Sequence, residues 1–484
     1  MNDAFNRELE REREYDHQEL DLVVQRNVPL LNYQQKEVYD TLMKVIADEN
    51  GGLYFLDAPG GTGKTFLMSL VLATVRARSN IAVAVASSGI AATLLEGCRT
   101  AHSAFKLPLN LQTIEEPTCN IAKHSAMAKV LAASKIIIWD ECTMAHKRAL
   151  EALNRTLKDL RNDSRYFGGA MILLSGDFRQ ILPVIPRSTA ADEINACLKS
   201  SNLWRYVKKL QLTTNMRVTL LNDTSAEDFS EQLLTIGNGQ VPVDESSGLI
   251  SFPNNFCNFV SSKDELINNV FPNIISNYKN NEWLSERAIL AAKNKDADDL
   301  NYIIQNKIIG TMHSFKSIDC VTNEDATNYP IEFLNSLDVP GLPPHNLRLK
   351  VGSVVIMLRN LNQPKLCNGT RLVVSKLMNN VIYATIMIGK FKGEEVLIPR
   401  IPMIPTDMPF EFKRLQFPIR LAFAMTINKS QGQSLKVCGL NLEHSCFSHG
   451  QLYVACSRVG RPSALFVFAP DNKTKNVVYH KVLK

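Results

Sequence analysis

A glycine-rich segment at residues 58–65 (APGGTGKT) has the residue types and spacing that hold the phosphates of a nucleotide. It lies between a short apolar stretch, expected to be a strand, and a stretch expected to be a helix. Glycines let backbone N–H groups curl around phosphate oxygens, and the helix start adds a favourable dipole. We expect Lys64 to reach the β- and γ-phosphates and Thr65 to hold Mg²⁺. The nucleotide contacts expected in this loop are Gly60, Gly61, Thr62, Gly63, Lys64 and Thr65. Ala58 stands where such loops usually have their first glycine, and its side chain is small enough to fit.

Two carboxylates and a glutamine follow the later apolar stretches. Asp140 and Glu141 come directly after residues 135–139 (KIIIW), and Gln180 comes soon after residues 171–174 (MILL). The carboxyl ends of parallel strands meet at one edge of a sheet, where ligands bind. We expect Asp140 to hold Mg²⁺ and Glu141 to orient or deprotonate an attacking water. Gln180 is expected to hydrogen-bond the γ-phosphate. A solvated strand end and a plain turn are the alternatives, and the nearby phosphate loop favours catalysis for the carboxylates.

Near-continuous apolar strands alternate with helices in the first part of the chain, which is expected to end near residue 215. The expected strands are residues 52–56, 81–86, 135–139 and 171–174, and the expected helices are residues 65–79 and 147–160, with another beginning at residue 90. Such a pattern is typical of a parallel sheet that is covered by helices on both faces.

The pattern changes in the second part of the chain. Residues 222–323 are expected to be mostly helical, and residues 340–346 (PGLPPHN) make a break. Alternating apolar residues after the break predict antiparallel strands at residues 352–358, 370–377 and 381–388. A buried strand at residues 421–426 (LAFAMT) and further helices then run to about residue 470.

The composition is that of a globular protein with a small basic excess. The chain has 484 residues, of which 21% are charged, and a formal net charge of +6. This length favours more than one domain, and the charge suits a polyanionic partner or an ordinary solvated surface equally. No apolar run approaches the roughly 20 residues that span a bilayer, and the opening residues lack the apolar core of a secretory signal. The ten cysteines include no C-x-x-C pair, so we expect reduced thiols in an intracellular protein.

Three side chains of types that can bind a metal ion lie close together near the end of the sequence. His444, Cys446 and His449 lie close together in the stretch LEHSCFSHGQ. A zinc site would need a fourth ligand or an open position, and no paired motif lies nearby. Packing residues on a turn and a helix are the favoured interpretation.

The motifs resemble, in their order, those of superfamily-one helicases. GGTGKT, a strand ending in WDE, and GDFRQILPV follow one another as in the first motor domain of these proteins. The closer resemblance is to the PIF-one (petite integration frequency) family, including the helicase halves of Helitron transposons. It is supported by LNYQQKEVYD, LEALNRTLKDLRN with FGG, FAMTINKSQGQSL and QLYVACSRV, and it covers about residues 31–470.

The resemblance implies an α/β fold: two RecA-like parallel-sheet motor domains, with a small β-rich, SH3-like insertion in the second. The expected parts are a charged lead at residues 1–27, a first RecA-like domain at 28–215, a second at 216–300 and 415–484, and the insertion at 301–414. ATP and Mg²⁺ would lie between the two motor domains.

The resemblance also assigns roles to residues outside the phosphate loop. Gln35 would contact adenine, and Arg458 from the second domain would reach the phosphates, together with Arg217 at the domain boundary. A surface salt bridge is the alternative for both arginines. A cationic finger of this kind contributes on the order of 10³–10⁵ in rate.

Residues that would contact a single DNA strand carry mostly hydroxyl and amide groups, which suit its backbone and read little sequence. They are Ser87, Ser88, Gly89, Thr100, His102, Ser103, Thr426, Asn428, Lys429, Ser430 and Gln431. Phe105 and Phe417 are candidates for base stacking, and core packing is the favoured alternative for both.

The function that the resemblance implies is an ATP-dependent DNA helicase that moves 5′-to-3′ on single-stranded DNA, with roles such as repair and recombination. Its expected partners are single-stranded and forked DNA, with RNA left open and no membrane. We expect a monomer that is located in the nucleus. The alternatives are a P-loop kinase or switch without a nucleic-acid track, and a decayed transposon relic that binds DNA passively.

Overall fold

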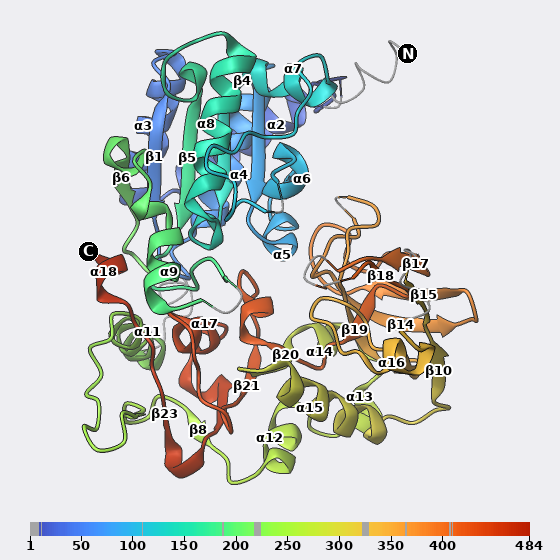
Figure 1. The fold of residues 1–484 in the computed structure, drawn as a ribbon. Helices are drawn as coiled ribbons and strands as arrows, with labels where there is room; N and C mark the ends of the chain where they lie inside the picture. The colour runs from blue at the N-terminus through green and yellow to red at the C-terminus, as the bar shows by residue number, and fades with distance from the viewer. Residues whose placement is uncertain are drawn as a thin grey trace. The chain divides into compact units, whose positions relative to one another are not determined.

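The computed structural model describes residues 9–10, 12–108, 110–185, 188–216, 224–321, 329–363, 365–405, 408 and 410–484. The chain forms two compact units (Figure 1). The first unit comprises Met1–Pro253, Phe447–Arg461 and Lys475–Lys484, and the second comprises Asn254–Cys446 and Pro462–Thr474. The segment at residues 447–461 therefore packs with the N-terminal half of the chain, although it follows residues of the second unit. The domain limits expected from the sequence stay predictions.

The first unit is built on a sheet of six strands in the order β3-β2-β4-β5-β1-β6, with every pairing parallel. The strands are β1 (Gly52–Asp57), β2 (Ile81–Ala86), β3 (Arg99–Thr100), β4 (Ser134–Asp140), β5 (Met171–Gly176) and β6 (Lys208–Gln211). All four strands expected from apolar runs are present. Their near-complete burial explains why they lack a polar face.

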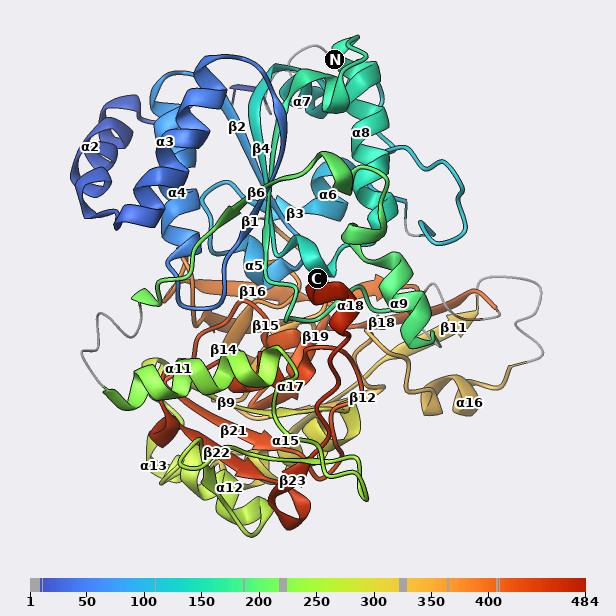
Figure 2. The ribbon, with the colours of Figure 1, turned by 90° about the vertical axis from the view of Figure 1, so that its left-hand side faces the viewer.

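Helices cover both faces of this sheet (Figure 2). Alternate strand residues point to opposite faces, so Leu56 and Ile138 pack with α3 (Tyr33–Ala47) and α4 (Lys64–Ala77), on which α2 (His17–Asn27) also packs. Phe55 and Ile137 pack instead with α6 (Ala101–Phe105), α7 (Ala126–Ala133) and α8 (Lys147–Arg161). The expected α/β arrangement is confirmed.

Shorter elements complete the first unit. They are η1 (Val28–Leu30), α5 (Gly89–Ala92), η2 (Cys142–Met144), η3 (Tyr166–Gly169), α9 (Ala190–Ala196), η4 (Leu198–Ser200), η5 (Trp204–Tyr206), α11 (Thr224–Gly237), β7 (Ile250–Ser251), α17 (Gln451–Cys456) and α18 (His480–Leu483). Helix α11 packs on α17, so two segments far apart in sequence lie side by side in this unit.

The second unit contains a smaller parallel sheet of five strands in the order β20-β9-β21-β22-β8. The strands are β8 (Asn258–Phe259), β9 (Arg287–Ala291), β20 (Ala424–Thr426), β21 (Val437–Asn441) and β22 (Leu465–Phe468). Helices α12 (Lys263–Val270) and α15 (Asn294–Lys307) pack against it. The sequence prediction of a mostly helical stretch missed β9, because a five-residue apolar run has no periodicity that separates strand from buried helix.

The predicted antiparallel strands are also present in the second unit. Their sheet has the order β16-β15-β14-β13-β19 and is antiparallel throughout. Its strands are β13 (Val354–Met357), β14 (Arg371–Leu377), β15 (Val381–Ile386), β16 (Glu395–Pro399) and β19 (Ile419–Leu421). The expected single strand LAFAMT is wrong in one respect, since Leu421 ends β19 in this sheet whereas Ala424 begins β20 in the parallel sheet.

Further short elements surround the two sheets of the second unit. The strands β10 (His313–Lys316) and β12 (Asn346–Leu349) pair with each other, as do β11 (Ile318–Val321), β18 (Phe412–Gln416) and β17 (Ile401–Met403) in a three-stranded sheet. The rest are α13 (Ile274–Asn277), α14 (Asn281–Ser285), α16 (Ile331–Ser336), η7 (Ile427–Ser430), η8 (Pro462–Ala464), η9 (Pro470–Asn472) and β23 (Lys473–Thr474). In the ranges that the structure describes, no helix is long and apolar enough to cross a bilayer.

Candidate nucleotide site and strand-contact residues

The phosphate loop joins β1 to α4 and turns on two glycines with positive φ. Gly61 has φ 93° and Gly63, which caps α4, has φ 77°. A Cβ at Gly61 would lie 2.6 Å from Asn215 Oδ1, and one at Gly63 would overlap the Gln35 amide. The loop therefore depends on glycine for both its conformation and its space. Ala58 is buried and its N–H donates to the Gly176 carbonyl at 3.2 Å, so its methyl group fits the core.

Gln35 supports this loop from behind. Its Nε2 donates to the Thr62 carbonyl at 3.0 Å, and its Oε1 accepts from the Asn32 N–H at 3.2 Å. The side chain is 2% exposed, and the Gln35 N–H completes a capping box with Asn32 at the start of α3. Both ends of the amide thus hold protein partners, and the expected adenine contact stays a prediction.

Lys64 lies between the two predicted carboxylates. Its Nζ is 3.2 Å from Asp140 Oδ1 and 3.2 Å from Glu141 Oε1. Burial alone would lower the pKa of Lys64, but the charges of Asp140 and Glu141 outweigh it and raise the pKa. The lysine therefore stays a cation. Glu141 has φ 47°, a strained conformation for a residue with a side chain, and such strain clusters at functional sites.

Gln180 and Arg458 also belong to the first unit. Gln180 is 4% exposed, and its Oε1 has no hydrogen-bond partner among the described residues. The Arg458 Nε donates to the Val454 carbonyl at 2.8 Å and its Nη2 donates to Ser457 Oγ at 2.8 Å. Ser457 and the residues after Arg458 line a pocket together with parts of the phosphate loop. The pocket's polar and backbone lining includes Gly60, Thr62, Thr213, Asn215, Ser230, Tyr453, Ser457 and Gly460.

The structure therefore brings Lys64, Asp140 and Glu141 together, and it places the Arg458 segment beside the phosphate loop. Arg217 lies outside the described residues. Sequence reasoning missed Asn215, whose side chain crowds Gly61 and donates to Ser230 Oγ at 2.8 Å. A signal was present in the polar stretch LTTNMR, which follows a strand of the same sheet.

Several predicted strand-contact residues of the first unit stabilise local structure. Ser87 Oγ accepts from Trp139 Nε1 at 3.0 Å, Ser88 caps α5, and Thr100 caps α6. His102 is exposed on α6 and lines a 170 Å³ cavity together with Ser87 and Trp139. A cavity that contains two predicted contacts is consistent with a binding surface, and the roles themselves stay predictions.

The predicted contacts of the second unit lie at the end of β20 and in the turn η7 that follows it. Ser430 and Gln431 are buried, and the Ser430 hydroxyl donates to the Ile427 carbonyl at 2.7 Å. Thr426, Asn428 and Lys429 remain partly exposed. Burial, with a smaller effect of nearby Arg420, lowers the pKa of Lys429.

Phe105 and Phe417 are core residues, as the favoured alternative held. Both are 0% exposed. Phe105 packs edge-on against Trp139 with ring centroids 5.6 Å apart, and Phe417 packs in the same way against Phe315 at 5.3 Å.

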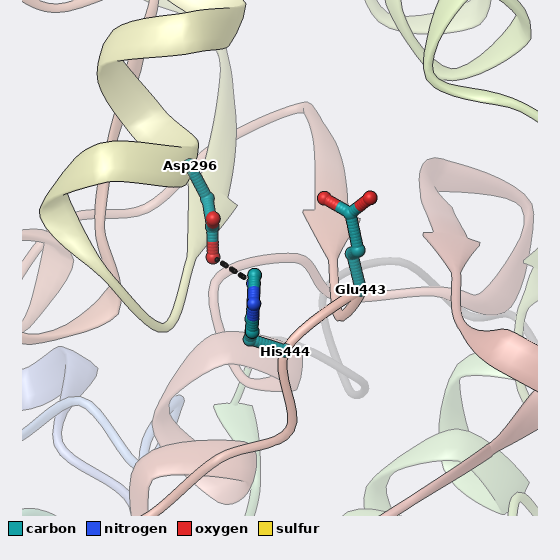
Figure 3. A group of neighbouring side chains, drawn as sticks. All are labelled: Asp296, Glu443 and His444. Carbon is teal, nitrogen blue, oxygen red and sulfur yellow. Dashed lines mark hydrogen bonds and ion pairs between the residues drawn. The ribbon is translucent and has the colours of Figure 1, made fainter.

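The three potential metal ligands of LEHSCFSHGQ have different neighbours. His444 Nδ1 lies 3.0 Å from Asp296 Oδ2 on α15 (Figure 3). Glu443 beside it pairs with Lys263 at 2.6 Å. Cys446 is buried, and burial raises its thiol pKa to about 12. His449 belongs to the other unit. His444 is itself exposed and bonds the turn after β21 to α15.

Comparisons with known proteins agree with this arrangement. The family model described as "PIF1-like helicase" matches residues 30–247, and the one described as "DNA helicase Pif1, 2B domain" matches residues 332–377. Among curated proteins, the chain is 25% identical to the ATP-dependent DNA helicase Pif1 of Campylobacter jejuni, over 92% of this chain and 95% of that protein. It is 24% identical to the ATP-dependent DNA helicase PIF1 of Danio rerio, over 89% of this chain and 60% of that longer protein.

Solved structures show the same fold. The crystal structure of Pif1 helicase from Candida albicans superposes with a TM-score of 0.66 at 22% identity, over 94% of this chain and 97% of that one. Pif1 helicase from Bacteroides, in complex with ADP-AlF3 and single-stranded DNA, superposes with a TM-score of 0.65 at 21% identity, over 92% and 95%. The more specific resemblance to Helitron helicases stays a prediction.

Proposed function

The chain belongs to the PIF1-like helicase family, and from this we propose that it is an ATP-dependent DNA helicase that tracks along single-stranded DNA and separates the strands of forked duplexes. The observation that carries the proposal is the buried contact of Lys64 with Asp140 and Glu141 at the end of a glycine-turned phosphate loop. A lysine, two carboxylates and a glycine-turned loop together suit hydrolysis of a nucleoside triphosphate.

Magnesium fits the oxygen donors at this place. Asp140 offers a carboxylate that is 1% exposed, and Thr65 offers a hydroxyl at the first turn of α4. Hard oxygen ligands of this kind suit Mg²⁺, which is normally shared with the substrate's phosphates. Bound there, the ion would neutralise charge on the phosphate oxygens.

The remaining residues act on the water and on the transferring phosphoryl group. Glu141 would orient the attacking water or accept its proton, and the buried Gln180 amide would hydrogen-bond the γ-phosphate. Lys64 and Arg458 would stabilise the charge that develops on the γ-phosphate oxygens. Arg217 is included in this proposal on the family resemblance alone.

The DNA side of the proposal uses the hydroxyl, amide and lysine groups named above in both units. Polar contacts to the sugar–phosphate backbone hold a strand without reading its sequence. A 5′-to-3′ direction, a monomeric motor and a nuclear location belong to the same proposal, and RNA remains open as a track.

Strand displacement tests the proposal and its direction together. Duplexes of one sequence that bear a single-stranded tail on either the 5′ or the 3′ side are incubated with protein, Mg²⁺ and ATP. We expect release of the labelled strand only from the 5′-tailed duplex, and none with Glu141→Gln. Hydrolysis of ATP without release from either substrate would contradict the helicase proposal.

A further inference from the structure

The loop at residues 177–180 and the short helix α17 are clasped together in the first unit. The loop follows β5 and carries Gln180, and α17 ends two residues before Arg458. These segments lie more than 250 residues apart in the chain, and Tyr453 contacts Asp177 across a separation of 276 residues. The clasp therefore joins the segment that carries Gln180 to the segment that ends near Arg458, and both residues are proposed to act at the γ-phosphate.

A buried hydrogen bond forms the centre of this clasp. The Tyr453 hydroxyl donates to Asp177 Oδ2 at 2.9 Å, and both residues are nearly inaccessible to solvent. Asp177 Oδ1 accepts from Arg179 Nη1 at 3.0 Å, and Arg179 Nε donates to Asn238 Oδ1 at 2.8 Å. Burial, followed by the negative charge of Asp177, raises the pKa of Tyr453 well above its usual value, so the hydroxyl keeps its proton and donates it.

Close backbone contacts around this bond also hold the α17 segment against the loop at residues 177–180. A Cβ on Gly450 would overlap the Arg179 carbonyl and would lie 2.7 Å from the Gln180 carbonyl carbon. His449 Nε2 lies 2.8 Å from the Phe178 carbonyl, and a Cβ on Gly237 would lie 2.8 Å from the Tyr453 ring. The helix thus rests directly on the backbone of the Gln180 loop.

We propose that Tyr453 is a positioning residue for nucleotide hydrolysis, whose hydrogen bond to Asp177 fixes α17 to the Gln180 loop so that Gln180 and Arg458 meet the nucleotide as one body. The inference rests on the proposed function. Hydrolysis is sensitive to misplacement of a charged group by about 1 Å, which can cost on the order of 100-fold in rate. A helix that begins on the Gln180 backbone and ends beside Arg458 transmits such a displacement directly.

The alternative is that the Tyr453 ring only fills space. Tyr453→Phe distinguishes the positioning role from the space-filling role, because it removes the hydroxyl and keeps the ring. Tyr39→Phe is the matched control, since Tyr39 is also buried in the first unit and its hydroxyl also has a buried partner, Thr74 Oγ1 at 2.8 Å. The control removes a hydroxyl from the α3–α4 packing and leaves the clasp intact.

Steady-state hydrolysis and transition-state binding supply the readouts. For Tyr453→Phe we expect kcat to fall about tenfold or more, as for loss of a hydrogen bond to a charged group, with KM for ATP and the Kd for an oligonucleotide within about twofold of wild type. Affinity for ADP with aluminium fluoride, which mimics the transition state, should fall by the same factor while ADP affinity is unchanged. Tyr39→Phe should keep the wild-type kcat.

An unchanged kcat in Tyr453→Phe would overturn the inference. A parallel loss of kcat and ADP affinity would also overturn it, because a general structural role predicts that both fall together. Some loss of thermal stability is expected in either case, since the variant removes the buried donor to Asp177 Oδ2. Failure of the proposed function is distinguishable: wild-type hydrolysis that ignores added DNA would refute the helicase while leaving the Tyr453 comparison valid.

Discussion

Replacing Gly450 with alanine should disable the enzyme through a single methyl group. Gly450 precedes α17 with φ +69°, and a Cβ there would overlap the backbone of the Gln180 loop. Neither partner is a flexible side chain, so α17 or the loop must move. Gly248 offers a matched control, because its φ is also +69° and nothing lies within 4 Å of the position of its Cβ.

The two substitutions differ only in the steric overlap. An alanine in the left-handed region costs about 1–2 kcal/mol at either position. Overpacking against fixed atoms adds about 1–3 kcal/mol at Gly450 alone. We therefore expect Gly450→Ala to be about 1–3 kcal/mol less stable than Gly248→Ala. Its ATP hydrolysis should fall by at least about tenfold, while Gly248→Ala keeps wild-type hydrolysis.

Thermal unfolding and steady-state ATP hydrolysis measure both quantities on the same preparations. Hydrolysis is compared at a temperature well below the unfolding transition of each variant, so that loss of folded protein does not contribute. A Gly450→Ala variant with the stability and the activity of Gly248→Ala would refute the close approach of α17 to the Gln180 loop.

Three further outcomes follow from buried groups. Glu141→Gln should lower hydrolysis by at least about 100-fold with nucleotide affinity retained, since it removes the proposed proton acceptor and keeps the size of the side chain. An ATPase assay and binding of a fluorescent nucleotide measure the two quantities. Asp319→Ala should lower the free energy of unfolding by about 3–5 kcal/mol, because it leaves buried Arg414, which lies 2.7 Å from Asp319, without its counter-ion. The control Asp40→Ala breaks an exposed ion pair with Lys36 and should change the melting temperature little. Burial lowers the pKa of His449 in the folded state from 6.5, although nearby Asp177 opposes this. The unfolded chain therefore binds the proton at a higher pH than the folded chain, and the free energy of unfolding should fall as pH drops below about 6.5. A His449→Gln variant whose stability has the same pH slope as wild type would contradict this.

Much of the first unit could be predicted from sequence because its signals are local. Residues 81–86 form an apolar run whose every residue is buried, and the structure has β2 at those limits. The phosphate loop is recognised from glycine spacing and its lysine, and both carboxylates follow a strand. Each of these features is encoded within about ten neighbouring residues.

Features that depend on distant contacts escaped the sequence. The hydrogen bond from Tyr453 to Asp177 spans 276 residues, and no local pattern marks it. LAFAMT reads as one strand, yet its ends join different sheets, because Ala422 and Phe423 between them pack in a core shared by both sheets. The hydroxyls of Ser88 and Thr100 fit DNA contacts by type, and only the structure shows that they cap helices.

The ATPase rate with and without a single-stranded oligonucleotide decides whether the chain is a DNA-tracking motor. Wild type and Lys64→Ala are measured side by side, since Lys64 lies 3.2 Å from both carboxylates that are proposed to act in hydrolysis. A DNA-tracking motor predicts strong stimulation by the oligonucleotide and no hydrolysis in the Lys64→Ala variant. Wild-type hydrolysis at the same rate with and without DNA would contradict the account and favour a nucleotide switch or kinase.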